Sequence, residues 1–508
     1  MSTTNVAENA KRNIIWGILN KITTLILPFI LRTFMIQYLG AEYLGLNGLF
    51  TSILQVLSLA ELGFGEAMIF SMYEPIAKNH NNEICALLNL YKKIYRAIGT
   101  IVLFVGLIIL PNLKHFINGE APADINIYAI YIIYLINTVS SYFLFAYKES
   151  LLVAHQRSDI KSNISTVINV SMYMVQIIIL ITIRNYYYYV IFMPIFTILN
   201  NIVTHIVTKN MYPQCFCSGK IDKIEIKNIQ KRVTGLFLYK ICSVFRNSFD
   251  SIIISSFIGL VALAQYQNYY YIINSIIGIL SVFTSSITAG VGNNIIKKSI
   301  EKNYNDYTNL SMMFMWIVGW CTVCLYCLYQ PFMKIWVGTD LMLSEEIMIS
   351  FCMYFFVLKA GDMCYVYRQA AGLWWQDKFR PVIEAVVNLS LNIILVKNFG
   401  IVGVLFSTII SLLAINFVWG AKILFKNYFK LSTKEYFTSM LYYSAVTLVN
   451  CIITHSLCEL MNIHGYIDLI VRGIICVIIP NIIFILFYFK LPYFNRTKIF
   501  IKRILRIS

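Results

Sequence analysis

Apolar runs of about 20 residues recur along the chain from Ile14 to Phe489 and are separated by short polar segments. This is the length that an α-helix needs to cross the hydrocarbon core of a bilayer, whereas a transmembrane β-barrel shows short segments of alternating hydrophobicity. The pattern predicts an all-α polytopic membrane protein. We expect about 14 membrane-spanning helices, over residues 14–38, 44–70, 94–111, 125–147, 162–183, 187–208, 233–259, 264–290, 310–334, 345–370, 381–398, 400–426, 436–461 and 466–490.

Composition agrees with this prediction. Hydrophobic residues make up 58% of the 508 residues and charged residues 13%, against roughly a quarter charged in soluble proteins. The N-terminal segment MSTTNVAENAKRN is polar and the first apolar run has full length, so we expect no signal peptide.

The formal net charge of +17 is distributed unevenly between the two sides of the predicted membrane domain. Most lysines and arginines fall in the tails and in the loops on the side of the termini. The opposite loops hold only Lys114, Arg184, Lys334 and Lys397. Because positively charged loops remain in the cytoplasm, we predict that both termini are cytoplasmic and that no nucleic acid is bound.

One internal repeat is visible at a shift of 219 positions, which aligns KRNIIWGILNK (11–21) with QKRVTGLFLYK (230–240). Lys21 and Lys240 therefore hold equivalent positions. Parallel repeats are typical of transporters whose substrate site lies between the two halves. We predict an N-terminal six-helix bundle (1–208), a basic cytoplasmic linker (209–232), a C-terminal six-helix bundle (233–430), and two additional helices with a basic tail (431–508).

Charged side chains occur inside several predicted spans, where each costs about 2.5–3.5 kcal/mol on insertion scales. Such residues are expected to face a bundle interior or a water-filled cavity, and a cationic cavity would attract an anion such as a lipid phosphate. The basic residues predicted to bind substrate are Lys21, Arg32, Lys240, Arg246, Lys359 and Arg368. The acidic residues Glu61, Asp250 and Asp362 are assigned to ion coupling or to charge pairs.

Structural roles for these charges stay open. Arg246 and Asp250 are spaced i,i+4, and Lys359 and Asp362 are spaced i,i+3, so each pair could neutralise itself or dock the two halves. Arg368 is close enough to the cytoplasm to snorkel. The two lysines of the repeat have no acidic residue within one turn of their own helices, which makes them the stronger cavity candidates.

The segment QYQNYYYIINS (265–275) places Gln267, Tyr270, Tyr271 and Asn274 along one face of the eighth span. Amide and phenol groups there suit hydrogen bonding and stacking to sugars. Aromatic residues at the outer interface and helix–helix contacts explain the same pattern, and both interpretations remain open.

No motif indicates catalysis of the kind found in soluble enzymes. The six histidines form no HExxH spacing and no Walker loop occurs, so we expect a transporter rather than an enzyme, with no cofactor. Cys321, Cys324 and Cys327 share a helical face without a histidine or carboxylate beside them. Packing is therefore the preferred interpretation, and no metal site is predicted.

Four stretches together resemble the Wzx-type polysaccharide flippases of the multidrug/oligosaccharidyl-lipid/polysaccharide exporter superfamily, over roughly residues 10–430. They are LGAEYLGLNGLFTSILQVLSLAELGFGEAM (39–68), YKKIYRAIG (91–99), SSFIGLVALAQYQNYYYIINSI (255–276) and RQAAGLWWQDKFRPVIEA (368–385). The resemblance implies a MATE-like fold, with two six-helix bundles around a central cavity that rock between inward-open and outward-open states.

The resemblance also implies a cargo: an undecaprenyl-pyrophosphate-linked oligosaccharide, moved from the cytoplasmic to the outer leaflet of a bacterial inner membrane for O-antigen or capsule synthesis. The cavity cations would then meet the pyrophosphate and glycan, and a gradient of Na+ or H+ would drive the cycle. A polysaccharide polymerase and a chain-length regulator would be partners. Lys240, Asp250, Glu61 and the Gly63/Gly65 pair lie in stretches that look like the family's. The chain departs from the family pattern at Glu74, Gln369 and Arg246, where a lysine, an acid and a small apolar residue are usual.

Two other function classes stay in view. A multidrug or other lipid exporter of the same superfamily would favour an acidic cavity for organic cations, whereas the deep charges of this sequence lean basic. A membrane glycosyltransferase or polysaccharide polymerase would need substantial outer loops with catalytic residues, and the predicted outer loops are short.

Overall fold

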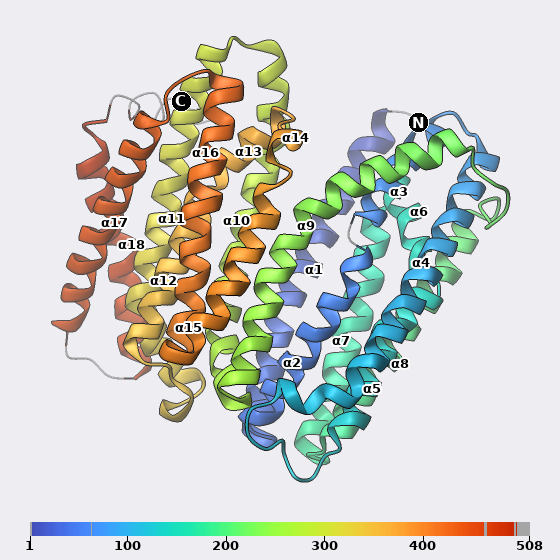
Figure 1. Cartoon of the computed structure of the whole chain (residues 1–508), viewed down its shortest axis with the longest axis horizontal. Helices are drawn as coiled ribbons and strands as arrows, with labels where there is room; N and C mark the ends of the chain where they lie inside the picture. Colours follow the sequence, from blue (N-terminus) through green and yellow to red (C-terminus); the bar gives the residue numbers. More distant parts are fainter. Residues whose placement is uncertain (1–2, 62, 462–464, 492–493, 495–508) are drawn as a thin grey trace. The chain divides into compact units, whose positions relative to one another are not determined.

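The computed structural model describes residues 3–61, 63–461, 465–491 and 494, without the side chains of residues 3–11, 14, 60, 231–232, 234–243 and 289. Within these residues all regular structure is helical and no strand occurs, which confirms the all-α prediction (Figure 1). The chain forms two compact units, Met1–Ala264 and Gln265–Ser508.

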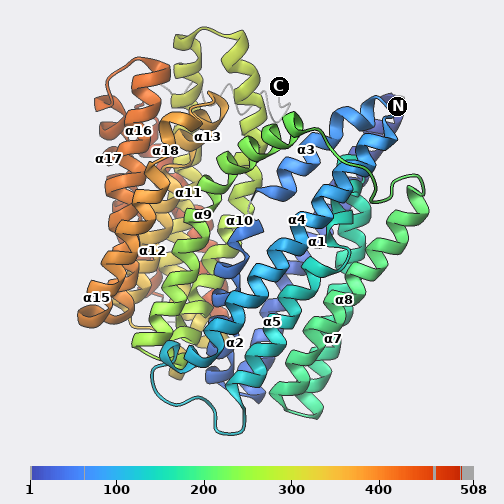
Figure 2. The same cartoon turned by 45° about the vertical axis from the view of Figure 1, so that its right-hand side comes forward.

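The first unit is built from nine long or short α-helices joined by brief 3-10 segments. These are α1 (Thr3–Tyr38), α2 (Ala41–Leu57), η1 (Ser58–Glu61), α3 (Phe64–Ala77), α4 (Asn81–Ile109), η2 (Leu110–Phe116), α5 (Ile127–Phe143), η3 (Ala146–Lys148), α6 (Glu149–Ala154), α7 (Ser158–Thr182), α8 (Tyr186–Met211) and α9 (Lys223–Phe257). Helix α7 packs between α1 and α8, α5 packs on α4 and α8, and α9 packs on α2 (Figure 2). The bundle boundaries predicted from the repeat stay a prediction.

Two breaks in the first unit interrupt apolar runs. The predicted span 44–70 is divided, because α2 ends at Leu57 and α3 begins at Phe64 after the 3-10 turn η1. The helix that starts with α5 bends by 47° before it continues as η3 and α6. Ser58 and Glu61 belong to the first of these breaks, and both line the polar cavity described below.

The second unit holds the remaining helices. These are α10 (Leu260–Lys297, which begins at the end of the first unit), α11 (Ile300–Trp336), η4 (Thr339–Leu341), α12 (Glu345–Ala360), α13 (Asp362–Ala370), α14 (Trp374–Asp377), α15 (Arg380–Ser411), η5 (Leu412–Phe417), α16 (Val418–Leu424), η6 (Phe425–Phe429), α17 (Lys434–Glu459) and α18 (Tyr466–Tyr488). Helix α11 is central to this unit, because it contacts α12, α17 and α18, while α12 also packs on α15.

The number of membrane-spanning helices differs from the prediction. Within the described residues, 10 helices are long and apolar enough to cross a membrane, or up to 11 if the bent α5–α6 pair is counted, rather than about 14. One reason is the division of residues 44–70 into α2 and α3. Another is that residues Trp374–Phe429 form one hydrogen-bonded run in which two predicted spans meet at Gly400, whose φ of 56° and ψ of −134° turn the chain.

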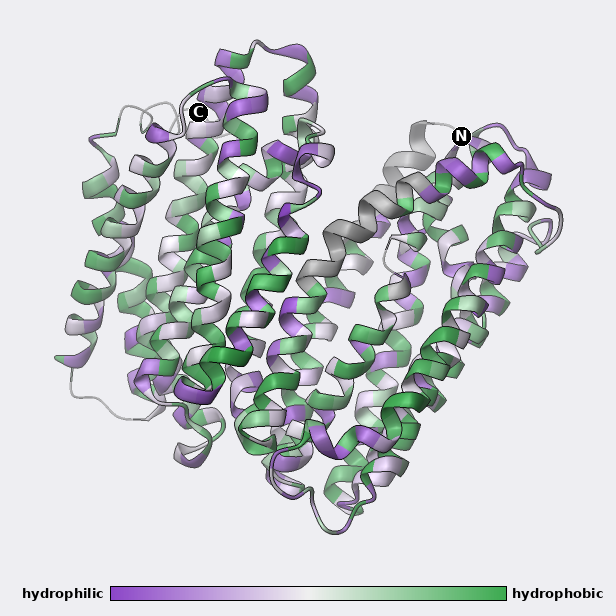
Figure 3. Cartoon of the chain, viewed as in Figure 1, coloured by the Kyte–Doolittle hydropathy of each residue, from purple (hydrophilic) through white to green (hydrophobic). Residues whose placement is uncertain are grey.

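Hydrophobic residues run along most of the length of the long helices (Figure 3), and many of their large apolar side chains are exposed. Examples are Ile178 on α7, Ile206 on α8, Leu448 on α17 and Ile474 on α18, each at least half exposed. Contiguous apolar surface of this extent is rare on soluble monomers and is expected of helices that face lipid.

Candidate functional site

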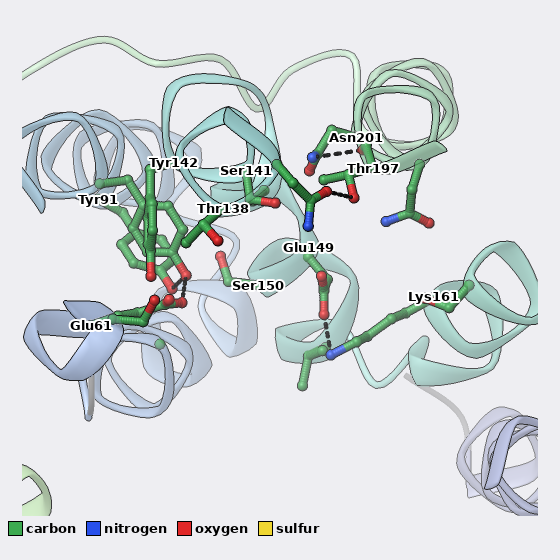
Figure 4. Close-up of a pocket in the computed structure, with 18 of the residues that line it drawn as sticks. Glu61, Tyr91, Thr138, Ser141, Tyr142, Glu149, Ser150, Lys161, Thr197 and Asn201 are labelled. Carbon is green, nitrogen blue, oxygen red and sulfur yellow. Dashed lines mark hydrogen bonds and ion pairs between the residues drawn. The ribbon is translucent and has the colours of Figure 1, made fainter. Parts of the chain in front are cut away.

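A polar cavity of about 710 Å³ lies within the first unit, between α3, α4, α5, α6, α7 and α8 (Figure 4). Six serine and threonine side chains, four asparagines and three tyrosines contribute to its lining. They are Ser58, Ser141, Ser150, Ser165, Thr138, Thr197, Asn137, Asn169, Asn200, Asn201, Tyr91, Tyr95 and Tyr142, with a charged group formed by Glu61, Glu66, Glu149 and Lys161. A cavity so rich in hydrogen-bonding groups is unusual within apolar helices, because each unpaired buried polar group costs free energy.

An acid–phenol cluster forms one side of this cavity (Figure 4). The Tyr91 hydroxyl donates to the Tyr95 hydroxyl at 3.0 Å, and the Tyr95 hydroxyl donates to the Glu61 carboxylate. The rings of Tyr91 and Tyr95 meet edge to face at 4.5 Å, and the Tyr142 ring lies 5.6 Å from that of Tyr95. The break at η1 is what brings Glu61 to these rings.

Gly65 explains how α3 approaches the cluster so closely. A Cβ atom at this position would lie 3.1 Å from the Tyr91 hydroxyl oxygen, which is tighter than ordinary van der Waals contact. Of the two glycines in the family-like stretch, Gly63 and Gly65, it is Gly65 that this close contact requires.

The other side of the cavity is formed by an ion pair and a set of amides. Glu149 on α6 pairs with Lys161 on α7 (Figure 4). The Thr197 hydroxyl donates to Asn137 Oδ1 at 2.7 Å, which links α8 to α5. The buried Oδ1 atom of Asn200 has no hydrogen-bond partner within the described part of the chain. A fixed acceptor of this kind is costly when empty, about 1–3 kcal/mol, and suits a ligand that carries a donor.

The charges that line the cavity are mainly acidic. Three carboxylates face it against the one lysine in its lining, and that lysine is already paired with Glu149. Oxygen ligands of this kind suit neutral polyhydroxyl groups, protons or a hard cation such as Na+. The net negative charge of this lining disfavours a pyrophosphate by like-charge repulsion.

An apolar cavity of about 710 Å³ lies in the second unit, between α11, α12, η5 and α17. Its surface comes mostly from hydrocarbon and aromatic side chains, such as Phe356, Phe417, Met440 and Leu448. A cavity of this composition binds by burial of apolar surface and suits a hydrocarbon chain.

The sequence-predicted residues of the first unit lie in different places. Glu61 lines the polar cavity. Lys21 is exposed on α1, and Arg32 is half-buried further along the same helix. On α9, Arg246 is half-buried and Asp250 is 3% exposed, whereas the side chain of Lys240 lies outside the described residues. Their roles in binding or coupling stay predictions.

In the second unit, Lys359 and Asp362 form an ion pair, with Lys359 only 5% exposed. This is the self-neutralising arrangement that their spacing allowed. The four predicted residues of α10 share its less buried side: Gln267, Tyr270 and Tyr271 are half-buried and Asn274 is exposed. Whether this face binds sugars stays a prediction.

The expectation that Arg368 snorkels is wrong. Its side chain is 4% exposed, packs against Gly420 and lies 3.9 Å from the Asp377 carboxylate. Asp377 also binds Arg380 at 2.6 Å, and Arg380 binds Glu384 at 3.0 Å. The acidic partner of Arg368, Asp377, is nine positions away in sequence and belongs to α14, so the turn between α13 and α14 decides the pairing.

Sequence reasoning missed most of the polar cavity. The signal that was available is the run Asn137, Thr138, Ser141 and Tyr142 on α5, which places four polar groups on one face of an otherwise apolar helix. The tyrosines of α4, spaced i,i+4, were part of a quoted family-like stretch but were not assigned to a site.

Comparison with known proteins supplies the family. The model of the polysaccharide biosynthesis protein family matches residues 10–289, more than half of the chain. The chain belongs to this family. That assignment confirms the resemblance to Wzx-type proteins of the exporter superfamily, and no curated protein matches the sequence.

Solved structures support the fold of this family member. A structure described as the lipid II flippase MurJ in an inward closed conformation has a TM-score of 0.68 and 16% identity, covering 94% of this chain and 99% of that chain. An inward-facing MATE family multidrug resistance transporter of the MOP superfamily has a TM-score of 0.60 and 15% identity, covering 79% and 97%. These similarities confirm the MATE-like fold.

A third structure bears on how the fold relates to function. It is a MOP superfamily transporter from Pyrococcus furiosus, described as having a binding pocket of reverse polarity, with a TM-score of 0.55 and 15% identity, covering 84% of this chain and 97% of that chain. One fold thus accommodates pockets of different polarity. Together with the apolar helices, the family and the fold make this chain a multi-pass membrane protein of the transporter and flippase type.

Proposed function

We propose that this protein is a flippase that moves an undecaprenyl-pyrophosphate-linked oligosaccharide from the cytoplasmic to the outer leaflet of a bacterial inner membrane. The observation that carries the proposal is the polar cavity of the first unit, where hydroxyl and amide groups and the unpartnered Asn200 acceptor lie among apolar helices. Family membership supports a role in polysaccharide biosynthesis, and the name of one structural neighbour describes a lipid-linked substrate.

The three chemical parts of such a substrate find different surroundings. The glycan matches the polar cavity, whose neutral donors and acceptors suit sugar hydroxyls. The isoprenoid chain matches the apolar cavity of the second unit. The pyrophosphate is assigned to the cations Lys21, Arg32, Lys240 and Arg246, which the sequence places among the basic residues of the membrane domain.

Glu61 is proposed as the group that couples transport to a Na+ or H+ gradient. It is a carboxylate in the cavity lining, and it accepts a hydrogen bond from a phenol that is itself buried. Both termini are placed in the cytoplasm on the charge distribution of the loops. A polymerase and a chain-length regulator are the proposed protein partners.

A multidrug exporter is the second candidate, and one observation favours it. The lining of the polar cavity is acidic, which would suit an organic cation. Deletion of the gene separates the two functions. The flippase proposal expects loss of surface polysaccharide and accumulation of lipid-linked repeat units in the cytoplasmic leaflet. Normal surface polysaccharide together with raised sensitivity to cationic drugs would reject it in favour of drug export.

Variants test the proposed anion site in the complemented deletion strain. Lys21→Ala is expected to abolish surface polysaccharide at normal protein abundance, because it removes a cation from the pyrophosphate path. Lys302→Ala, at an exposed position on α11, is the matched control and is expected to leave polysaccharide unchanged. Equal polysaccharide from both variants would contradict the role given to Lys21.

A further inference from the structure

Three buried cysteines meet where α11, α17 and α18 pack together in the second unit. The Sγ atoms of Cys327, Cys458 and Cys476 all lie within 4.8 Å of one another, and each residue is at most 1% exposed. All three are free thiols. Each comes from a different helix, so their meeting depends on the tertiary packing.

The three helices are held in place around the thiols by polar contacts. The Trp320 indole of α11 donates to the backbone carbonyl of Cys476 at 2.8 Å, which fixes α18 against α11. The Asn450 amide of α17 donates to the carbonyl of Pro480 at 3.0 Å, which fixes α18 against α17. A site on rigid, mutually braced helices loses little entropy when it binds an ion.

We propose that Cys327, Cys458 and Cys476 form a binding site for a single monovalent soft cation, Cu(I), in trigonal thiolate coordination. Metal–sulfur bonds of about 2.3 Å in a trigonal plane place the sulfur atoms about 4.0 Å apart, so each thiol has to move by less than about 1 Å from its present position. Small rotations about χ1 supply such movements.

Ligand type and number select the ion. Soft thiolate ligands favour Cu(I) or Zn2+, but structural zinc sites take four ligands, and within the described residues no fourth cysteine, histidine or carboxylate lies within 4.8 Å of all three sulfur atoms. Each cysteine that binds Cu(I) does so as a thiolate and releases its proton to solvent.

The site would connect the last two helices to the rest of the second unit. Helices α17 and α18 contact each other and α11, and the cluster lies at that junction. A bound ion therefore adds a stabilising link at this place, independently of the proposed flippase function.

The test uses the full-length protein in detergent, reduced with a phosphine and loaded anaerobically with Cu(I) in the presence of a competing Cu(I) chelator. The expected result is one copper retained per chain, with X-ray absorption showing only sulfur neighbours. Cys458→Ala and Cys476→Ala are expected to lower retention at least tenfold. Cys352→Ala, which removes a buried free thiol on α12, is the matched control and should not change it.

Each other outcome overturns the proposal. A wild-type protein that loses all copper to the chelator shows that the thiols only pack, whatever the variants do. Retained copper with nitrogen or oxygen neighbours, or retention unchanged in both cluster variants, places the ion elsewhere. Gel-filtration profiles and helical circular dichroism confirm that each variant is folded, and Cys458→Ser replaces Cys458→Ala if the latter is not.

Discussion

The ion pair between Lys359 and Asp362 allows a sharp distinction between a structural and a substrate-binding lysine. Lys359 is the last but one residue of α12, and Asp362 begins α13, so the pair bridges the break between these helices. The Lys359 side chain is 7% exposed and that of Asp362 19%. In Asp362→Asn the ammonium group therefore stays in place and loses its counter-charge.

Removal of one partner from a buried pair costs about 3–5 kcal/mol, because the remaining charge has no compensation. A loss of 3 kcal/mol is roughly a 100-fold change in the equilibrium between folded and unfolded protein. Lys359→Met combined with Asp362→Asn removes both charges and is expected to recover most of the loss. The control is Asp306→Asn, which breaks the exposed pair with Lys298 and is expected to cost about 0–1 kcal/mol.

Thermal unfolding of the purified variants in detergent measures the stability, and surface polysaccharide in a complemented deletion strain measures the function. If the lysine is structural, the double variant restores both. A double variant that is stable but makes no polysaccharide shows that Lys359 binds the substrate anion. An Asp362→Asn protein as stable as the Asp306→Asn control would refute the buried-pair reasoning itself.

Three further predictions concern the first unit. Glu61→Gln still accepts the hydrogen bond from Tyr95 but carries no exchangeable charge, so polysaccharide export should fall while the unfolding temperature stays within a few degrees; normal export would remove Glu61 from coupling. Gly65→Ala places a Cβ atom 3.1 Å from the Tyr91 hydroxyl and should reduce export, whereas Gly17→Ala, with nothing within 4 Å of its added Cβ, should not. Burial raises the pKa of the Cys215 thiol to about 11, so roughly one thiol in a thousand is ionised at pH 8. Alkylation of Cys215, measured by mass spectrometry, should therefore be about tenfold faster at pH 9 than at pH 8. An alkylation rate that does not depend on pH would contradict this.

The fold could be predicted because the length and polarity of each run are set by the bilayer rather than by distant contacts. The break inside the predicted span 44–70 could not. The 3-10 turn Ser58–Glu61 interrupts that apolar run, and the backbone conformation there is decided by tertiary packing. The turn at Gly400, in contrast, lies at the predicted boundary between spans 381–398 and 400–426.

The polar cavity was missed for a different physical reason. A single serine or threonine in an apolar helix can bond to the carbonyl four residues before it, as Ser140 does with Ile136 and Thr182 with Ile178. Such residues are satisfied on their own helix and carry no information about a site. A residue that lines a cavity differs from one that bonds only to its own helix in having polar side chains of other helices beside it. The sequence of a single helix does not show which helices will lie beside it.

A charged side chain in a membrane-spanning helix is costly in free energy unless it has a partner. That cost shows that a partner is needed, but not whether the partner is the substrate or another residue of the protein. In the second unit, the cost is met by carboxylates: Lys359 has Asp362, and Arg368 and Arg380 share Asp377. In the first unit, the charges that line the polar cavity are mainly acidic, so this cavity suits sugars rather than the phosphate groups that link them to the lipid. If the substrate is a lipid-linked oligosaccharide, the groups that bind its glycan and those that bind its pyrophosphate must therefore lie at separate places. The acidic cavity would repel the pyrophosphate, so the anion needs cations elsewhere in the protein.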